Sequence, residues 1–129
     1  MESTQKLTKR AYEGVPKLRY FTLDEFNCTH TGENNMCPEF LEALDNLRHE
    51  CGFPFIITSG YRSIDHPIEA AKAVPGTHTR GIAADIKITN GQQRYLLLKY
   101  AFELGFTGIG VAKDFIHLDT RLLPIVWTY

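Results

Sequence analysis

Residues 75–88 read PGTHTRGIAADIKI, a loop rich in Pro, Gly and Thr that leads into an apolar run. The proline and the glycines argue against a helix in the loop, whereas IAADIKI, residues 82–88, has the apolar character of a buried strand. His78 lies in the loop and Asp85 lies in the run that follows it. A histidine and an acid on either side of such a junction are candidate ligands rather than ordinary loop or core residues.

Two helices are predicted on either side of this strand. In CPEFLEALDNLRHECG, residues 37–52, Pro38 suits a first helical turn and Gly52 suits a helix end. One face of this helix carries the apolar residues Phe40, Leu44, Leu47 and Cys51. The second helix is expected within residues 89–106, with Asn90 as the N-cap, Gln93 completing a capping box, and Gly105 at the end.

The remaining segments predict strands and turns. FPFIIT, residues 53–58, reads as a buried strand, and a short helix is expected to begin near Asp65. GIGVAKDFIHLDT, residues 108–120, predicts two short strands around a tight turn at 112–114. The tail, residues 121–129, is apolar enough to pack back on the body. The fold class is therefore α+β, a small antiparallel or mixed sheet with helices packed on it.

Length and composition predict one globular domain. The chain has 129 residues, 43% hydrophobic and 22% charged, and we expect a polar N-terminal segment over 1–17 and a single domain over 18–129. A net charge of −1 gives no electrostatic reason to expect a nucleic-acid partner. No apolar run reaches the length of a transmembrane segment, and the N-terminus has no apolar core of a signal peptide.

The three cysteines leave several interpretations open. Cys28 and Cys37 lie on either side of His30, which suggests a metal knuckle, but the close spacing of structural zinc sites is absent. Plain thiols are the simpler interpretation. A Cys28–Cys37 disulfide is the alternative if the protein works outside the cytosol.

A second group of polar residues has the chemistry of a catalytic metal site. Two histidines and an aspartate form a three-ligand set for zinc that leaves a fourth position for water. A free carboxylate then serves as general base and an arginine stabilises the oxyanion. The chain offers His78, Asp85 and His117 as ligands, Asp114 as base and Arg62 as oxyanion partner.

Spacing restricts where these side chains lie. Asp114 and His117 are three residues apart, so a straight strand would place them on opposite faces, and Asp114 must lie in the turn or in a bulge. Asp119 shares a face with His117 and is placed to orient it. Simpler interpretations remain open: a turn arginine for Arg62, a turn former for Asp114, and a salt bridge to Arg121 for Asp119.

Taken together, three motifs resemble a known family. SGYRS at 59–63, His-x-x-Gly-x-Ala-x-Asp at 78–85 and Asp-x-x-His-x-Asp-x-Arg at 114–121 resemble the zinc D-alanyl-D-alanine carboxypeptidases and L-alanyl-D-glutamate endopeptidases. The similarity runs from about Leu18 to Tyr129, includes the late Trp127, and is closest to the short bacterial and phage branch. It implies the small α+β fold of these peptidases, which the hedgehog signalling domain shares.

The resemblance implies a role for each matched residue. His78, Asp85 and His117 match the zinc ligands, Asp114 matches the catalytic acid, and Arg62 matches the arginine that binds substrate. The implied substrate is a peptidoglycan stem peptide, cut either at D-Ala–D-Ala or at L-Ala–D-Glu. His66 matches a histidine for which a structural role is equally open.

Two departures from the family pattern concern the substrate side of the site. Gly76 stands where the family often has Ser, and Pro67 stands where it often has Asn. Both changes bear on substrate preference more than on zinc binding.

The resemblance also leaves biological context open. Without a signal peptide, the chain fits cytoplasmic synthesis with release to the cell wall by another protein, as in a phage lysis system with an endolysin. It fits equally a cytosolic precursor-trimming enzyme, or a chain whose leader was removed. We expect a monomer. The alternative function is a non-catalytic, zinc-containing module that binds wall peptides, and Asp114 discriminates, because such a module needs no free carboxylate beside the metal.

Overall fold

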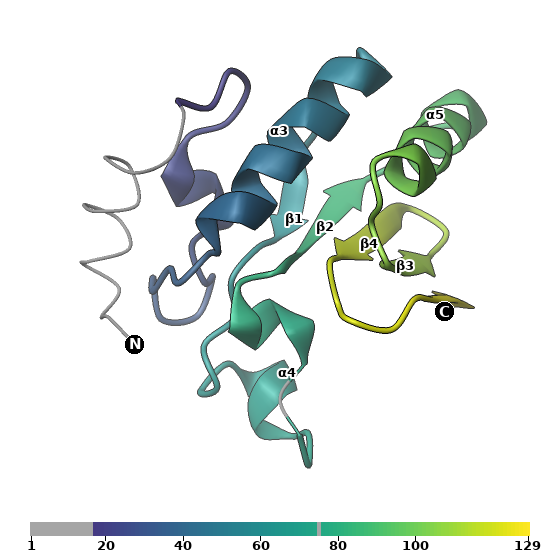
Figure 1. The fold of residues 1–129 in the computed structure, drawn as a ribbon. Coiled ribbons are helices and arrows are strands. Elements are labelled where there is room, and N and C mark those ends of the chain that lie inside the picture. Colours follow the sequence, from purple (N-terminus) through teal and green to yellow (C-terminus); the bar gives the residue numbers. More distant parts are fainter. Residues whose placement is uncertain (1–16, 75) are drawn as a thin grey trace.

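The computed structural model describes residues 17–74 and 76–129, so the N-terminal segment predicted over 1–17 lies outside the described residues except for Lys17. Helices and strands alternate along the chain as the sequence predicts for an α+β fold, and Figure 1 shows their arrangement. In order they are η2 (Leu23–Phe26), α3 (Pro38–Cys51), β1 (Ile57–Ser59), α4 (Pro67–Ala70), η3 (Thr77–Arg80), β2 (Ala83–Lys87), α5 (Gly91–Glu103), β3 (Gly108–Val111), β4 (Phe115–Asp119) and β5 (Ile125–Thr128), where η denotes a 3-10 helix.

The strands form one mixed sheet of five strands in the order β1-β2-β4-β3-β5. All neighbouring pairs are antiparallel except β3 and β5, which run parallel. β3 and β4 form the predicted hairpin, and Ala112 donates its backbone N–H to the carbonyl of Phe115 across the turn, 3.0 Å. The strands β2 and β4 lie inside the sheet, which is where two of the candidate ligands are found.

The two long helices form and end where their sequences predict. Pro38 begins α3, and Gly52 caps its C-terminus in the left-handed region at φ 74°. At α5, the Asn90 side chain accepts the N–H of Gln93 at 2.8 Å. The Gln93 side chain reaches back to the N–H of Thr89 at 3.0 Å rather than to the cap residue itself, so the capping box is shifted by one residue.

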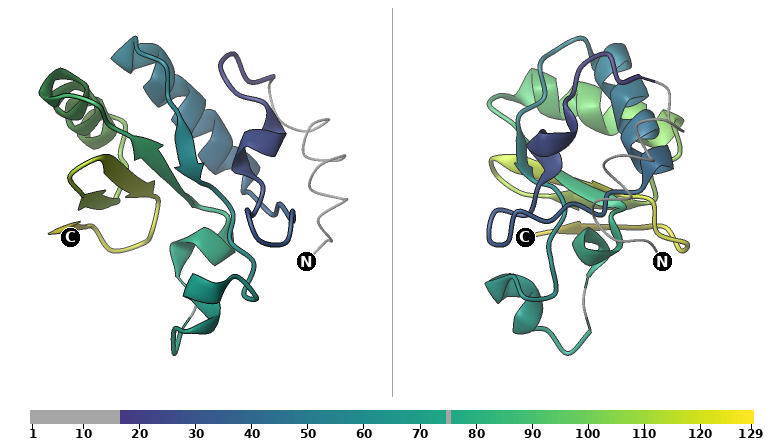
Figure 2. Two further views of the ribbon diagram at one scale, coloured as in Figure 1. Left: turned by 180° about the vertical axis from the view of Figure 1, so that it is seen from behind. Right: turned by 90° about the vertical axis from the view of Figure 1, so that its left-hand side faces the viewer.

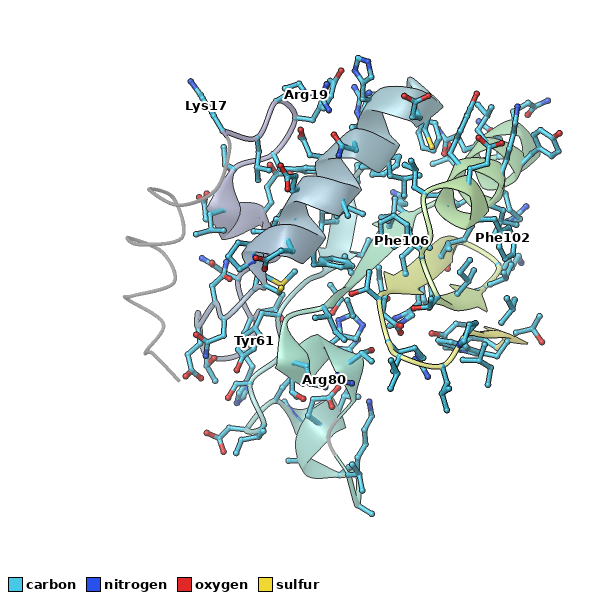
Figure 3. All side chains as sticks on the ribbon, viewed as in Figure 1. Lys17, Arg19, Tyr61, Arg80, Phe102 and Phe106 are labelled. Atoms are coloured by element: carbon cyan, nitrogen blue, oxygen red, sulfur yellow. The ribbon has the colours of Figure 1, made fainter. Side chains whose placement is uncertain are left out.

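The core lies between these helices and one face of the sheet. Figures 1 and 2 show α3 and α5 side by side over the sheet, with the α4 segment on its other side. Phe106, which follows α5, packs edge-on against Phe40 of α3 with ring centroids 6.0 Å apart (Figure 3). From the strands, Ala84, Ile86, Ile109, Ile116 and Leu118 are fully buried in this core. Because side chains alternate along a strand, Asp85 and His117 point to the opposite face.

Three local expectations need correction. The strand predicted over 53–58 is only Ile57–Ser59, because β1 is an edge strand with a register shift, and Ile56 is 56% exposed. The loop that carries His78 contains the 3-10 helix η3 rather than irregular chain. The tail does more than pack back, because Ile125–Thr128 adds β5 to the sheet.

Two further observations bear on the sequence-based expectations. No helix in the described part of the chain is long and apolar enough to cross a membrane. The cysteines Cys28, Cys37 and Cys51 are all free thiols, which agrees with the interpretation that no Cys28–Cys37 disulfide forms. Burial raises the pKa of the Cys51 thiol to about 12.

Candidate metal centre

The structure brings His78, Asp85 and His117 together on the face of the sheet opposite the helices. Asp85 of β2 and His117 of β4 are direct partners in the antiparallel ladder, and η3 delivers His78 from above. The Nε2 of His78 lies 3.2 Å from the Nδ1 of His117 and 3.3 Å from the Oδ1 of Asp85. The third separation, from His117 Nδ1 to Asp85 Oδ1, is 3.0 Å.

These separations fit a tetrahedral metal ion. Ligand atoms about 2.0–2.1 Å from zinc at tetrahedral angles lie about 3.3 Å from one another. The three side chains are buried, yet they line a cavity of about 450 Å³ that leads to solvent. Among the described residues no other cluster of three such side chains has this geometry, so the knuckle considered around Cys28 and Cys37 does not form there.

Outer contacts fix which nitrogen of each histidine faces the cluster. The Nδ1 of His78 lies 2.7 Å from the carbonyl oxygen of Gly60 and donates to it, which leaves Nε2 free to bind a metal. The Nε2 of His117 donates to the Oδ2 of Asp119 at 2.7 Å, which leaves Nδ1 free. The predicted orienting contact between Asp119 and His117 is therefore present.

Both carboxylates at the cluster are held in the ionised form. Burial opposes ionisation of Asp85, but hydrogen bonds and charge from His117 and His78 outweigh it and hold the pKa of this carboxyl well below its usual value. Burial likewise opposes ionisation of Asp119, and hydrogen bonds from His117 and Arg121 lower its pKa. Arg121 contacts Asp119 through Nη2 at 2.6 Å, so the salt bridge and the orienting role coexist.

Arg62 lies at the cavity beside the ligands, as predicted. Its Nη2 is 3.6 Å from the Oδ2 of Asp85, and its Nε donates to the hydroxyl of Ser59 at 3.1 Å. Its Nη1 donates to the Oε2 of Glu69 at 3.1 Å. Glu69 is a buried acid that no sequence pattern marks, because a glutamate on a short helix gives no signal of burial.

The structure does not bring Asp114 into the cavity. It lies in the β3–β4 turn, as the spacing required, but it is exposed and is not among the residues that line the cavity. Its backbone carbonyl accepts the N–H of Ile88 at 2.8 Å. The role of Asp114 as base stays a prediction.

An aromatic wall lines the cavity next to the ligand His117. It consists of Phe115, Trp127 and Tyr129, of which two lie on or next to β5. The Trp127 ring packs against His117 with centroids 5.1 Å apart. Trp127 belongs to the family resemblance of the sequence, but no sequence signal indicates that the three aromatic side chains lie together.

Two glycines of β3 leave room for this arrangement. A Cβ at Gly110 would lie 2.6 Å from the Trp127 ring, and one at Gly108 would collide with the Asp119 carboxylate. Alternate glycines in the strand GIGV are a sequence signal that other groups approach the backbone closely. This signal could have predicted that side chains pack against β3.

His66 has a structural position. It precedes α4 as the N-cap residue, and its Nδ1 accepts the backbone N–H of Ile68 at 3.2 Å. Its ring lies 6.0 Å from that of His30. The contact supports the structural alternative for this residue.

A buried His-Asp-His group at a cavity is the ligand set of a metallohydrolase, which is the class that the fold and the site define. The sequence matches the family described as Peptidase M15 over residues 19–119. Because this match covers most of the chain, the protein belongs to the peptidase M15 family, which supports a zinc-dependent metallopeptidase. No curated protein matches the chain in a sequence search.

Proposed function

We propose that this protein is a zinc peptidase that hydrolyses bonds in peptidoglycan stem peptides, as a D-Ala–D-Ala carboxypeptidase or an L-Ala–D-Glu endopeptidase. The observation that supports it best is the ligand cluster, whose three atoms are 3.0–3.3 Å apart at an open cavity. His78, Asp85 and His117 would hold the zinc ion. When bound, zinc polarises a carbonyl and makes its water acidic enough to attack.

The residues of the chain supply binding, charge and proton transfer. Arg62 lies between the ligand Asp85 and the buried Glu69, so its guanidinium is fixed beside the ligands and can bind the oxygen on which negative charge develops. A general base must take a proton from the attacking water and return it to the leaving amine.

Asp114 is the carboxylate we assign to that role, by elimination. Asp85 is a ligand, Glu69 is used by three donors, and Asp119 is engaged by His117 and Arg121. Asp114 matches the acid of the Asp-x-x-His motif, and its carboxylate is not engaged by another side chain of the described residues. Asp114 is exposed in the turn next to Phe115, which lines the cavity, and the contacts of a catalytic base often form only in the substrate complex.

The biological setting is part of the proposal. The partner is the stem peptide, with no nucleic acid, and the chain acts as a monomer. Cytoplasmic synthesis with release to the wall by another protein, as for a phage endolysin, is the setting we propose.

One observation favours the alternative, a zinc-containing module that binds wall peptides without cutting them. No free carboxylate lines the cavity among the described residues. This module would keep the metal ligands and the cavity but would not hydrolyse the bound peptide.

Paired zinc and activity measurements test the proposal. Wild type, Asp114→Ala and the control Asp65→Ala, an exposed acid outside the cavity, are assayed for bound zinc and on purified cell-wall peptides. We expect about one zinc per chain in all three, and turnover in wild type and Asp65→Ala. Asp114→Ala should lose a factor of about 10²–10⁴ in kcat, the usual contribution of a general base.

Each other result has a separate meaning. Zinc with turnover in none of the three favours the binding module. Full activity in Asp114→Ala removes Asp114 as base while leaving the peptidase intact. Absence of zinc from wild type after zinc is supplied contradicts the metal site itself.

A further inference from the structure

Lys72 lines the cavity together with Arg62 and Arg121. Lys72 follows α4, and its side chain is 40% exposed, so its ammonium is accessible from the cavity. The sequence motifs do not include it. Its position depends on Glu69, which lies three residues earlier at the end of the same short helix.

Glu69 fixes the geometry of this end of the cavity. Its side chain is fully buried, and its Oε2 accepts from Lys72 Nζ at 3.0 Å and from Arg62 Nη1 at 3.1 Å. Its Oε1 accepts the backbone N–H of Gly76 at 2.9 Å. One carboxylate thus holds two cations side by side and joins α4 to the segment that leads to His78.

Gly76 provides the space for the lysine head. A Cβ at this position would lie 3.0 Å from Lys72 Nζ and 3.6 Å from Glu69 Oε1. A side chain there would make the flexible ammonium shift by a few tenths of an ångström, so the glycine leaves room for its observed position. An ammonium has three donors, and Glu69 uses one, so the others are available to a ligand.

The charges that line the cavity favour an anionic ligand. Arg62, Lys72 and Arg121 line it, and their carboxylate partners are Glu69, Asp85 and Asp119. Of the three carboxylates only Asp85 lines the cavity, so its lining carries two more positive than negative charges even without a metal ion. A peptide with a free carboxylate offsets part of that excess. Lys72 is the most exposed of the three cations, at 40% against 15% for Arg62 and 30% for Arg121.

Resting on the proposed function, we propose that Lys72 binds a free carboxylate next to the scissile peptide bond, and that Glu69 is the positioning residue that holds Lys72. The specificity of the site is then for peptides with an ionised carboxylate beside the bond that is cut. Peptides in which that group is a primary amide are poor ligands.

The test uses a matched pair of stem peptides that differ only in this group, one with the carboxylate and one with the primary amide. Wild type, Lys72→Met, Lys72→Arg and the control Lys99→Met are compared, because Lys99 lies on α5, on the other side of the sheet. Both kcat/KM and equilibrium binding to the metal-free protein by calorimetry are measured.

We expect wild type and Lys99→Met to prefer the carboxylate peptide by roughly 10–100-fold, the usual range for a hydrogen bond to a charged group. Lys72→Met should lose the preference, chiefly by a higher KM for the carboxylate peptide, and Lys72→Arg should keep most of it. Glu69→Gln should weaken the preference in the same direction, which a purely structural role would not do to the ratio of the two peptides.

The outcomes separate this inference from the proposed function. Turnover without a carboxylate preference, or a preference that Lys72→Met retains, overturns the inference and leaves the peptidase in place. Absence of turnover contradicts the peptidase, and the calorimetric preference still decides whether Lys72 binds the carboxylate. Equal binding of the two peptides by wild type overturns the inference in either case.

Discussion

The two ends of the cavity are built in different ways. At the ligand end, Asp85 and His117 are paired residues on two strands inside the sheet, and η3 adds His78. At the cationic end, Arg62 and Lys72 lie outside any strand, next to a helix of only four residues. There one buried carboxylate, Glu69, joins the two cations and the backbone of residue 76.

This difference separates what the backbone fixes from what charge fixes. Hydrogen bonds of the β2–β4 ladder set the spacing of Asp85 and His117, and those bonds do not depend on either side chain. No ladder constrains the cationic end, so its geometry depends on ion pairs and hydrogen bonds to Glu69. We therefore expect a change at the ligand end to alter binding but not the fold, and loss of one charge at the other end to alter the fold locally.

The largest effect is expected from Asp85→Ala. It removes one of three ligands, so zinc affinity should fall by more than the roughly 10–100-fold loss that an outer contact causes. Because the β2–β4 ladder remains, the far-UV circular dichroism spectrum should stay native. Zinc affinity is measured by competition with a chelator of known affinity.

Asp65→Ala is the matched control, because Asp65 is exposed and close in sequence to the cationic end but is not a ligand. It should bind zinc like wild type. A native Asp85→Ala with unchanged zinc affinity would contradict the assignment of the ligand set. A loss of the native spectrum would contradict the view that the ladder alone holds this end together.

A smaller effect is expected from Glu69→Gln, measured as the free energy of unfolding in urea at several pH values. Burial opposes ionisation of Glu69, but the Gly76 N–H, Lys72 and Arg62 outweigh it and lower its pKa from 4.5 to about 2. Ionised Glu69 therefore stabilises the folded state fully above about pH 4.5, and this contribution is lost as pH falls toward 2. At pH 7 we expect the variant to be less stable by about 3 kcal/mol, as for breaking a buried ion pair.

The difference between wild type and variant carries the pH dependence, since other groups that titrate in both proteins cancel. It should be constant from pH 7 to about pH 5 and shrink below pH 4.5. Glu42→Gln, an exposed substitution on α3, should change stability by less than about 0.5 kcal/mol. A difference that does not shrink in acid would mean that Glu69 contributes through packing rather than through charge.

The ligand end could be predicted from the sequence because its signals are local. His78 and Asp85 lie at a loop–strand junction, and the parity of spacing put Asp114 in a turn and Asp119 on the face of His117, as the structure has them. The helices α3 and α5 followed from apolar periodicity and caps. Each of these inferences needed only a few neighbouring residues, whereas the grouping of His117 with His78 and Asp85 rested on the family resemblance of three separate motifs.

The rest could not be predicted because it depends on contacts between distant segments. Glu69 is buried only because Arg62 and residue 76 close around it, and nothing in PIEA indicates this. β5 forms because the C-terminal tail pairs with the free edge of β3. The tail has no alternation of apolar and polar residues that would predict a strand. The position of Asp114 outside the cavity could not be predicted for the same reason. Residue spacing places Asp114 in the turn, but it does not determine the direction of the side chain.

The smallest effect is expected from Asp119→Asn, which separates orientation from ligation within the ligand end. The Asp119 carboxylate accepts the Nε2–H of His117 and is fully buried. Asparagine keeps the size and one acceptor but loses the charge that makes His117 a stronger ligand, so zinc affinity should fall by about 10–100-fold. Chelator competition measures this loss, which should stay well below that of Asp85→Ala.

Arg121→Gln is the comparison that assigns the cause. It removes the guanidinium partner of Asp119, 2.6 Å away, but leaves the contacts to His117 and to the Thr77 hydroxyl. A small loss in Arg121→Gln beside a larger one in Asp119→Asn means that the carboxylate acts on the metal through His117. Equal losses in the two variants would mean that the ion pair with Arg121 is what matters, and the ligand end would then depend on charge as the cationic end does.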